Sequence, residues 1–499
     1  MNKFLKGILV GSTMLAGLAL PHLAQAADLT IALSNPVNTF DPHMTASVGT
    51  DLSVLSHIYP ALILRGPDLK LHGSLAKEWS LVDDNTWRFT LQDGAKFSNG
   101  EPLDAEAVKW NLDRVRDPAI KARIASWFTL VSEVNVISPT ELEVKTSAPY
   151  PAFADQLSMF LLLPPKWAAE HNPVNETMSG GPYKVRTIVP GESVVLDANP
   201  DYFGDKAEFD SVTFQIIPET GSRIAALLSG DVDMINGIPV TEIDRIKQSG
   251  NATAGAVDST RSMMIKFNTT VPPFDNVKVR QALNYAVDKE GISKALFNGL
   301  AQPSLCQVLT PNYFGFNPDL KAYPYDPDKA AQMLAEAGVD LSKPIEFDVP
   351  SGVYLQGTEV AQVVASQLTD IGLNVKITEL EFSVYMNKYL QSHELSPISL
   401  LAQAWPTIDA DGLLTLFAPG NNYAYWDNAD FGAALAEGRA STDPAVRQAA
   451  YKKATEVMCD QAPAIFLYAQ PATYAYANDI TWTPRGDDWV RAFDMHPAK

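Results

Sequence analysis

The chain has 499 residues, more than a single hydrophobic core normally serves, so we expect two or three packed units. It carries 38 Lys and Arg against 58 Asp and Glu, and the resulting net charge of −20 argues against nucleic acid and anionic lipid as partners. This charge does not determine the sign of a binding cleft, whose lining residues can oppose the charge of the whole surface.

Residues 1–26 have the features of a cleavable secretory signal. Lys3 and Lys6 provide the positive start, a mostly apolar run follows from Gly7 to Leu20, and Ala24-Gln25-Ala26 has the small-x-small cleavage pattern. The alternative is a retained membrane anchor, but this run is too short to span a bilayer well. No Cys stands at the cleavage point, so lipid tethering is not expected. We therefore expect a mature chain that is free in the periplasm of a Gram-negative bacterium.

The first predicted elements are a strand at Leu29–Leu33, a loop at 38–42 and a helix from about 51 to 64. The stretch from Trp87 to Val108 is more informative. Its first five residues alternate apolar with polar, which is typical of a half-buried strand. A turn at Ser98-Asn99-Gly100 follows, and then a helix with Asp104 as its N-cap. Taken locally, this stretch predicts a strand, a turn and a capped helix.

The residues of this stretch closely resemble a segment shared by the extracytoplasmic solute-binding proteins of peptide- and nickel-type ABC transporters, called family 5. Ser179–Lys184 is similar to the Gly-Thr-Gly-Pro-Tyr of that family with one position substituted, and Asn199–Phe203 is another family-like phrase. The resemblance covers essentially the whole mature chain. It implies an α/β, two-lobed periplasmic-binding-protein fold with an extra N-terminal α+β subdomain and a ligand cleft between the lobes.

The order of elements supports an α/β lobe, because a strand at 212–217 is followed by a helix at 221–228 and a strand at 230–235. Pro272-Pro273 precedes a new helix, and we place the first crossing between lobes there. The predicted second lobe has helices near 276–289, 327–338, 356–371 and 443–459 and strands at 345–349 and 375–378. The predicted division is signal 1–26, lobe I 27–270 with a subdomain at about 70–190, lobe II 271–477, and a return to lobe I at 478–499.

Cys306 and Cys459 are the only cysteines. In an oxidising compartment they can form one structural disulfide, with two buried thiols as the alternative. The pair forms no Cys-x-x-Cys motif, so a catalytic role is not expected.

No catalytic motif is present: the chain has no Gly-x-Ser-x-Gly, no Walker loop and no His-Glu-x-x-His. Its histidines show no i, i+4 pair and none pairs with a Cys at zinc-ligand spacing. We therefore expect no enzymatic activity, no metal site and no cofactor. A secreted hydrolase, with a catalytic group assembled from distant residues, is the alternative class.

The segment Ala404–Gly412 is the main candidate for ligand contact. The resemblance implies that this loop presents a Trp to the cleft, here Trp405, and that peptide-binding relatives place an Asp three positions later to bind the α-amino group. That position is Ile408 here, which argues against free-amine peptides. Asp409 and Asp411 are candidate substitutes, and the alternative for both is turn formation and helix capping.

Further candidates follow from position in the chain. Arg261 and Arg485 are candidate counter-charges for a solute carboxylate, with a structural ion pair as the alternative for each. Residues that are candidates for the cleft wall, each with a structural role as the alternative, are Thr39, Phe40, Trp127, Tyr385 and Tyr423.

We predict from these observations a monomeric, periplasmic substrate-binding component of an ABC importer. It closes on a short peptide or an amino-acid-derived solute such as an opine and delivers it to the permease subunits in the inner membrane. A metal chelate or another small polar solute is the alternative ligand. Shifting a two-state protein from 1:99 to 99:1 closed needs about 5.5 kcal/mol, which two or three charge-assisted hydrogen bonds and an aromatic wall can supply.

Overall fold

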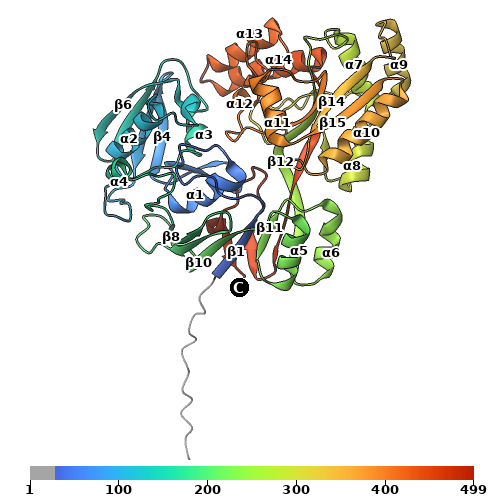
Figure 1. Ribbon diagram of the computed structural model, residues 1–499. Helices are drawn as coiled ribbons and strands as arrows, with labels where there is room; N and C mark the ends of the chain where they lie inside the picture. The colour runs from blue at the N-terminus through green and yellow to red at the C-terminus, as the bar shows by residue number, and fades with distance from the viewer. Residues whose placement is uncertain (1–27, 499) are drawn as a thin grey trace, which may run out of the picture.

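The computed structural model describes residues 28–498, and the predicted signal peptide at 1–26 lies outside these residues. The chain folds into two lobes, which two long strands connect (Figure 1). These strands are β12 (Ala252–Phe267) and β17 (Ala464–Ala477), and they pair antiparallel along most of their length. The predicted α/β, two-lobed fold is confirmed.

One sheet runs through both lobes in the order β15-β14-β16-β12-β17-β11-β1-β10-β9-β8. The pairing of β12 with β17 shifts in register between Asp258 and Ser262. Before this shift β12 lies in lobe I, and after it β12 also pairs with β16 in lobe II. The domain boundary at residue 270 stays a prediction, while the strand pairing changes earlier in the chain.

Lobe I contains the mixed part of this sheet, in which β1 pairs parallel with both β10 and β11. Its strands alternate buried and half-buried residues because one face packs on a core and the other is partly exposed. Its sheet strands and main helices are β1 (Asp28–Leu33), β8 (Tyr183–Val189), β9 (Ser193–Ala198), β10 (Ser211–Ile216), β11 (Met234–Asn236), α1 (Ser53–Ile58), α5 (Thr220–Ser229) and α6 (Ile243–Gln248).

Lobe II contains the parallel strands β14 and β15 beside β16, with helices on both faces. The predicted helices and strands of this lobe are all present within a few residues. Its elements are α7 (Val277–Ala286), α8 (Lys289–Phe297), β13 (Gln302–Pro303), α9 (Pro327–Glu336), β14 (Pro344–Pro350), α10 (Gly357–Asp370), β15 (Asn374–Leu380), α11 (Phe382–Met386), β16 (Ile398–Gln403), α12 (Ala410–Thr415), α13 (Ala429–Arg439) and α14 (Pro444–Gln461).

A four-stranded antiparallel sheet in the order β4-β5-β7-β6 forms a subdomain of lobe I. The predicted strand at Trp87 is β5, and the Asp104 side chain caps α2 by accepting from the backbone N–H of Ala107 at 3.1 Å. A separate core between Leu62 and Leu162 supports this sheet. The subdomain elements are β4 (Ala76–Asp83), β5 (Thr86–Leu91), α2 (Ala105–Arg116), β6 (Val131–Ser138), β7 (Glu141–Thr146), α3 (Phe153–Leu157) and α4 (Pro165–Glu170).

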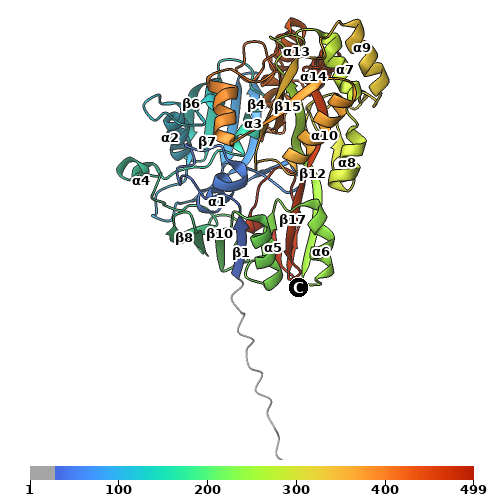
Figure 2. The ribbon, with the colours of Figure 1, turned by 45° about the vertical axis from the view of Figure 1, so that its right-hand side comes forward.

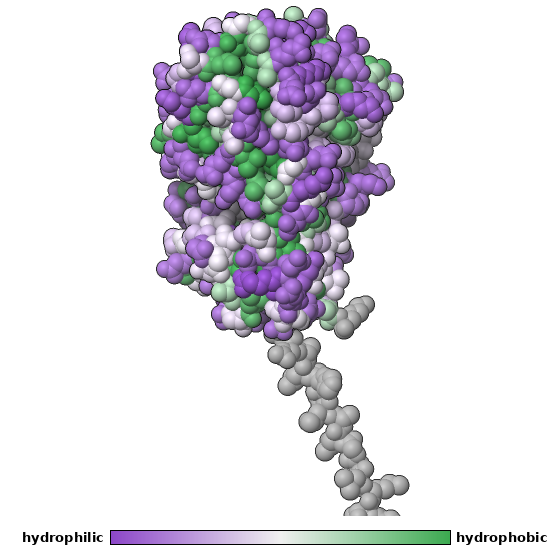
Figure 3. Space-filling view, turned by 90° about the vertical axis from the view of Figure 1, so that its right-hand side faces the viewer, coloured by the Kyte–Doolittle hydropathy of each residue, from purple (hydrophilic) through white to green (hydrophobic). Residues whose placement is uncertain are grey.

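The remaining cores follow the two faces of the long sheet. One core covers a single face in both lobes, beneath α5, α6, α7, α8, α9 and α10, which line up on the same side of the molecule (Figure 2). The outer surface on this side is mainly hydrophilic with a narrow apolar streak (Figure 3). The opposite face has a separate core in each lobe. Within residues 28–498, no helix is long and apolar enough to cross a membrane.

Two elements differ from the prediction. The helix expected at 51–64 is a π-helical turn at Val48–Leu52 followed by α1, which ends at Ile58. Pro60 explains the early end, because a proline excludes the preceding residue, Tyr59, from the helical region. The residues after 478 form a small separate sheet of β18 (Ile480–Trp482) and β19 (Met495–Pro497), and the strand that returns to lobe I is β17.

Cys306 and Cys459 are joined by a disulfide that closes a loop of sequence separation 153. Cys306 is fully buried in the core that lies under α12, α13 and α14. The bridge therefore ties the segment before α9 to the last helix of lobe II.

Candidate functional site

A cleft of about 1820 Å³ lies between the lobes. Lobe I contributes its loops at 46–50, 123–130 and 148–152. Lobe II contributes residues 352–355, the Trp405 loop and parts of α12 and α13. The crossing segments close the cleft at its base through Thr260, Arg261 and residues 470–474 and 487–488. The cleft is thus lined by both lobes and by the segments that connect them.

The base of the cleft holds an ion pair. Arg261, at the register shift of β12, pairs with Asp488, and both side chains are about one-third exposed, at 30% and 35%. Asp488 raises the pKa of Arg261, so the guanidinium stays charged. The backbone N–H of Thr260 donates to the carbonyl of Gly486 at 2.9 Å, which fixes the segment carrying Asp488 to the crossing strand.

Trp405 lies against Gly412 of α12 at the lobe II side of the cleft. A Cβ atom added at Gly412 would meet Trp405 Cδ1 at 1.9 Å, so the indole occupies the space that the glycine leaves open. The Tyr313 hydroxyl accepts from the Trp405 backbone N–H at 2.6 Å and fixes the start of the loop. The turn continues into Ile408, whose φ of 55° is a strained value for a β-branched residue.

The two aspartates that follow have different roles. Asp409 is buried, caps α12 by accepting from the Asp411 N–H at 2.9 Å, and pairs with Arg447 at 2.8 Å. Burial raises the pKa of Asp409 to about 6 even beside this arginine. Asp411 lines the cleft and pairs with Arg439. The capping role considered for both residues therefore belongs to Asp409.

On the lobe I side, Trp127 lies in a short 3-10 helix, Ala125–Phe128, and lines the cleft. The Tyr150 hydroxyl donates to the Trp127 carbonyl at 3.0 Å and holds this turn in place. Arg123, two residues before the turn, is exposed and lines the cleft. Among the ion pairs of residues 28–498, none includes Arg123, whereas Arg439 and Arg447 are both paired.

The structure brings five of the predicted contact residues to the cleft and leaves five away from it. The five that line it are Trp127, Arg261, Trp405, Asp411 and Tyr423. Of the others, Asp409 is the helix cap described above, and Phe40 is buried in the lobe I core. Thr39 caps its own loop, because its hydroxyl accepts from the Asp41 N–H at 3.1 Å. Tyr385 is fully buried and donates to the Leu400 carbonyl at 3.0 Å.

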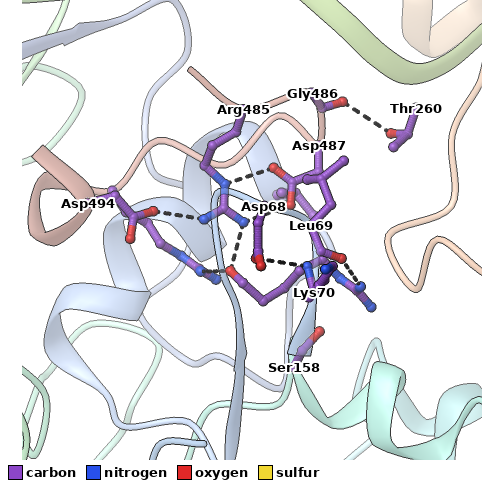
Figure 4. Close-up of polar contacts among 12 residues, drawn as sticks. Asp68, Leu69, Lys70, Ser158, Thr260, Arg485, Gly486, Asp487 and Asp494 are labelled. Atoms are coloured by element: carbon purple, nitrogen blue, oxygen red, sulfur yellow. Dashed lines mark hydrogen bonds and ion pairs between the residues drawn. The ribbon is translucent and has the colours of Figure 1, made fainter. Parts of the chain in front are cut away.

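Arg485 also lies away from the cleft. It is fully buried between Asp487 and Asp494, to which it donates at 2.8–2.9 Å (Figure 4). Its charge is satisfied inside lobe I, so the structural ion pair considered for it is present. Its neighbours Asp487 and Asp488 line the cleft instead.

Several residues that line the cleft are not among those predicted from the sequence. Arg123, Tyr150, Arg439 and Arg447 come from separate loops and helices, and no local motif surrounds any of them. Their common property, a position on facing edges of two lobes, arises only from the tertiary arrangement. The acidic partners of two of these arginines are 28 and 38 residues distant, which spacing alone does not reveal.

The chain is similar to known binding proteins over most of its length. It is 27% identical over 475 residues to the glutathione-binding protein GsiB of Escherichia coli (strain K12), with 91% of each chain covered. The GsiB of Salmonella paratyphi A is also 27% identical, over 486 residues and 93% of each chain. These relatives are binding proteins, so the hydrolase alternative receives no support from them.

Solved structures of the same fold cover nearly all of the chain. The ABC transporter substrate-binding protein CtaP of Listeria monocytogenes superposes with a TM-score of 0.85 at 22% identity, covering 95% of this chain and 100% of that one. NikZ of Campylobacter jejuni, in complex with Ni(L-His), gives 0.82 at 23% identity, covering 94% and 99%.

The family model described as bacterial extracellular solute-binding proteins, family 5 Middle, matches residues 70–425, which include the subdomain, the crossing strand β12 and the Trp405 loop. This match and the two-lobed cleft confirm the predicted class: the chain belongs to family 5 of the bacterial extracellular solute-binding proteins.

Proposed function

We propose that the protein captures an amino-acid-derived solute bearing at least one carboxylate, such as a short peptide or an opine, in the cleft between its lobes. It acts in the periplasm as a monomer, performs no chemistry on the solute and delivers it to the permease of an ABC importer. The observation that carries this proposal is an excess of arginine in the cleft of a strongly acidic chain.

The charged residues that line the cleft, within the part of the chain that the structure describes, are five arginines and three aspartates. This leaves a surplus of two positive charges, five minus three, in a chain whose net charge is −20. They are Arg123, Arg223, Arg261, Arg439, Arg447, Asp411, Asp487 and Asp488. Because a planar guanidinium matches a carboxylate with two parallel hydrogen bonds, such a cleft favours an anionic group on the solute.

Arg123 is the arginine best placed for this contact. Arg223 donates to the carbonyls of Ile217 and Pro218 at 2.8–2.9 Å, and Arg261, Arg439 and Arg447 have aspartate partners. Arg123 is exposed at the cleft wall four residues before Trp127. A cation and an indole that line the same cleft suit a solute that has a carboxylate and an apolar portion.

The ligands of similar proteins support the same solute class. The relatives from Escherichia coli and Salmonella paratyphi A are named for glutathione, a tripeptide with carboxylates. AgaA of A. tumefaciens R10, in complex with agropinic acid, has a TM-score of 0.80 at 24% identity, covering 95% of this chain and 99% of that one.

The first experiment identifies the solute that co-purifies with the protein by mass spectrometry after denaturation, followed by calorimetry of its binding to refolded protein. We expect an amino-acid-derived acid. Arg123→Gln should then weaken binding of that acid roughly tenfold or more, because a charge-assisted hydrogen bond is lost.

Arg245→Gln is the matched control, because Arg245 is an exposed, ion-paired arginine on α6 of lobe I, outside the cleft lining. It should bind like the wild type. A solute with no acidic group, or unchanged affinity in Arg123→Gln, would contradict the proposal.

A further inference from the structure

A hairpin of lobe I reaches across to lobe II. It consists of β2 (Ile63–Arg65) and β3 (Leu71–Gly73), which pair antiparallel and are joined by a tight turn at 66–70. Leu69, at the tip, packs against the lobe II core cluster, whose buried members lie between Met264 and Phe466. Leu69 adopts a φ of 60°, a strained value for a residue with a side chain.

Arg65, at the end of β2, makes the polar part of this contact. Its guanidinium donates to the Leu69 carbonyl at 2.7 Å, to Asp155 at 2.6 Å and to the Thr407 carbonyl of lobe II at 2.8 Å. The side chain is only 5% exposed, so water does not replace these bonds easily. The Arg65 side chain therefore stabilises its own hairpin and also binds the backbone of lobe II.

The base of the hairpin is fixed to lobe I. The Arg65 carbonyl accepts from Arg485 and from Arg491, both at 2.9 Å. Figure 4 shows the turn residues Asp68–Lys70 beside the buried Arg485 cluster. The base of the hairpin is held firmly in place, because both arginines are fully buried and Arg485 is paired with two aspartates.

The lobe II carbonyl that accepts from Arg65, that of Thr407, belongs to the Trp405 loop. Thr407 lies two residues after the Trp that lines the cleft and directly before Ile408, the residue with the strained φ of 55°. Strained backbone persists where surrounding contacts over-determine it. The hydrogen bond from Arg65 to the Thr407 carbonyl depends on the closed arrangement of the lobes. It therefore links closure to the conformation of the loop that faces the solute.

We propose that the β2–β3 hairpin is an interlobe latch, in which Leu69 and Arg65 hold the lobes closed and Arg65 is a positioning residue for the Trp405 loop. This rests on the proposed function only in taking closure of the cleft as the act of capture. The latch is encoded in lobe I and needs no contact with the solute.

The test measures closure without any solute. Asp84 of lobe I is exposed and Thr442 of lobe II is half-buried, and they lie side by side, with 2.7 Å between Thr442 Oγ1 and Asp84 Oδ1. The two native cysteines are joined to each other, so Asp84→Cys and Thr442→Cys introduce the reactive thiols. The rate at which a short bis-maleimide joins these thiols in the ligand-free full chain reports the closed population.

In this reporter background, Leu69→Gly removes the tip side chain at a φ that glycine tolerates. Arg65→Lys keeps a cation beside Asp155, but one ammonium nitrogen cannot occupy both positions of the two guanidinium nitrogens that donate to Leu69 and to Asp155 and Thr407. Both should lower the ratio of closed to open molecules about tenfold, as expected for the loss of a buried charge-assisted bond or a well-packed Leu, and so slow cross-linking, with little change in the melting temperature.

The matched controls are Lys121→Gly, another exchange to glycine at positive φ in lobe I, and Arg88→Lys, at an exposed ion pair. Both should cross-link like the parent. Parental rates in Leu69→Gly and Arg65→Lys, with the melting temperature retained, would overturn the latch. That result would leave solute capture untouched, because no solute takes part.

Discussion

At the scale of single residues, the position of Trp405 depends on a missing side chain. Gly412→Ala would place a Cβ atom 1.9 Å from Cδ1 and 2.2 Å from Nε1 of the indole, so the rigid ring must move. We expect solute affinity to fall about tenfold, the usual scale for a displaced aromatic anchor. Stability should change little, because the cost of displacing the indole offsets the roughly 1 kcal/mol by which alanine is favoured over glycine in a helix. Calorimetry with the co-purified solute and urea unfolding separate the two effects.

Gly432→Ala is the control, because Gly432 lies in α13 and meets only Pro419, at 3.0 Å and beyond. Its affinity should equal that of the wild type. If Gly412→Ala also bound normally, the indole would not be part of the solute site.

Lys266 gives a prediction about pH. It is buried at 1% exposure, within 4.2 Å of the Phe417 ring centroid, and makes no ion pair or hydrogen bond within residues 28–498. Burial lowers the pKa of Lys266 to about 7, far below its ordinary value. Between pH 7 and the ordinary value of about 10.4, the unfolded chain binds this proton and the folded chain does not. The Lys266 contribution to stability therefore rises with pH across this range.

Lys266→Met should remove that contribution. We expect the variant to be more stable than the wild type at pH 6, by up to a few kcal/mol, and the difference to shrink toward pH 10. Urea unfolding at both pH values measures it. A constant difference between the two proteins would show that Lys266 does not titrate in this range.

At the scale of elements, α12 depends on one buried pair. Asp409 caps the helix and balances Arg447, so Asp409→Ala should lower the free energy of unfolding by about 3–5 kcal/mol through an uncompensated buried charge. Removing both charges, in Asp409→Leu with Arg447→Met, should recover most of this loss. Urea unfolding of the single and double variants tests it, and equal losses in both would rule out the charge as the cause.

The elements also show which structural features could be predicted from the sequence. The strand at Trp87, the turn at Gly100 and the Asp104 cap were predicted correctly, because each depends on neighbours within a few residues. The helix predicted at 51–64 is too long, because Pro60 ends the helix although the apolar pattern continues beyond it. Local signals thus gave most element positions to within a few residues.

At the scale of the whole molecule, the two-lobed architecture followed from a resemblance spread over the chain, whereas the cleft did not. Arg485 and Tyr385 were plausible contacts by type, but their partners, Asp494 and Leu400, occupy them in the interior. Arg123 carries no local sign of the role proposed for it, since only the tertiary arrangement places it in the lining of the cleft. Such positions depend on long-range packing, which one sequence does not disclose.

The strand order of lobe I has a consequence for biosynthesis. β11 and the first half of β12 both lie against the end of β17, at residues 471–477, so lobe I obtains the strand that joins these two last. A ribosome must make more than nine-tenths of the 499 residues before this lobe can finish its sheet. Until then β11 and the first half of β12 have no strand between them, and the sheet of lobe I is incomplete. A chain that terminates before residue 471 therefore leaves lobe I without one strand of its sheet, however much of lobe II has been made.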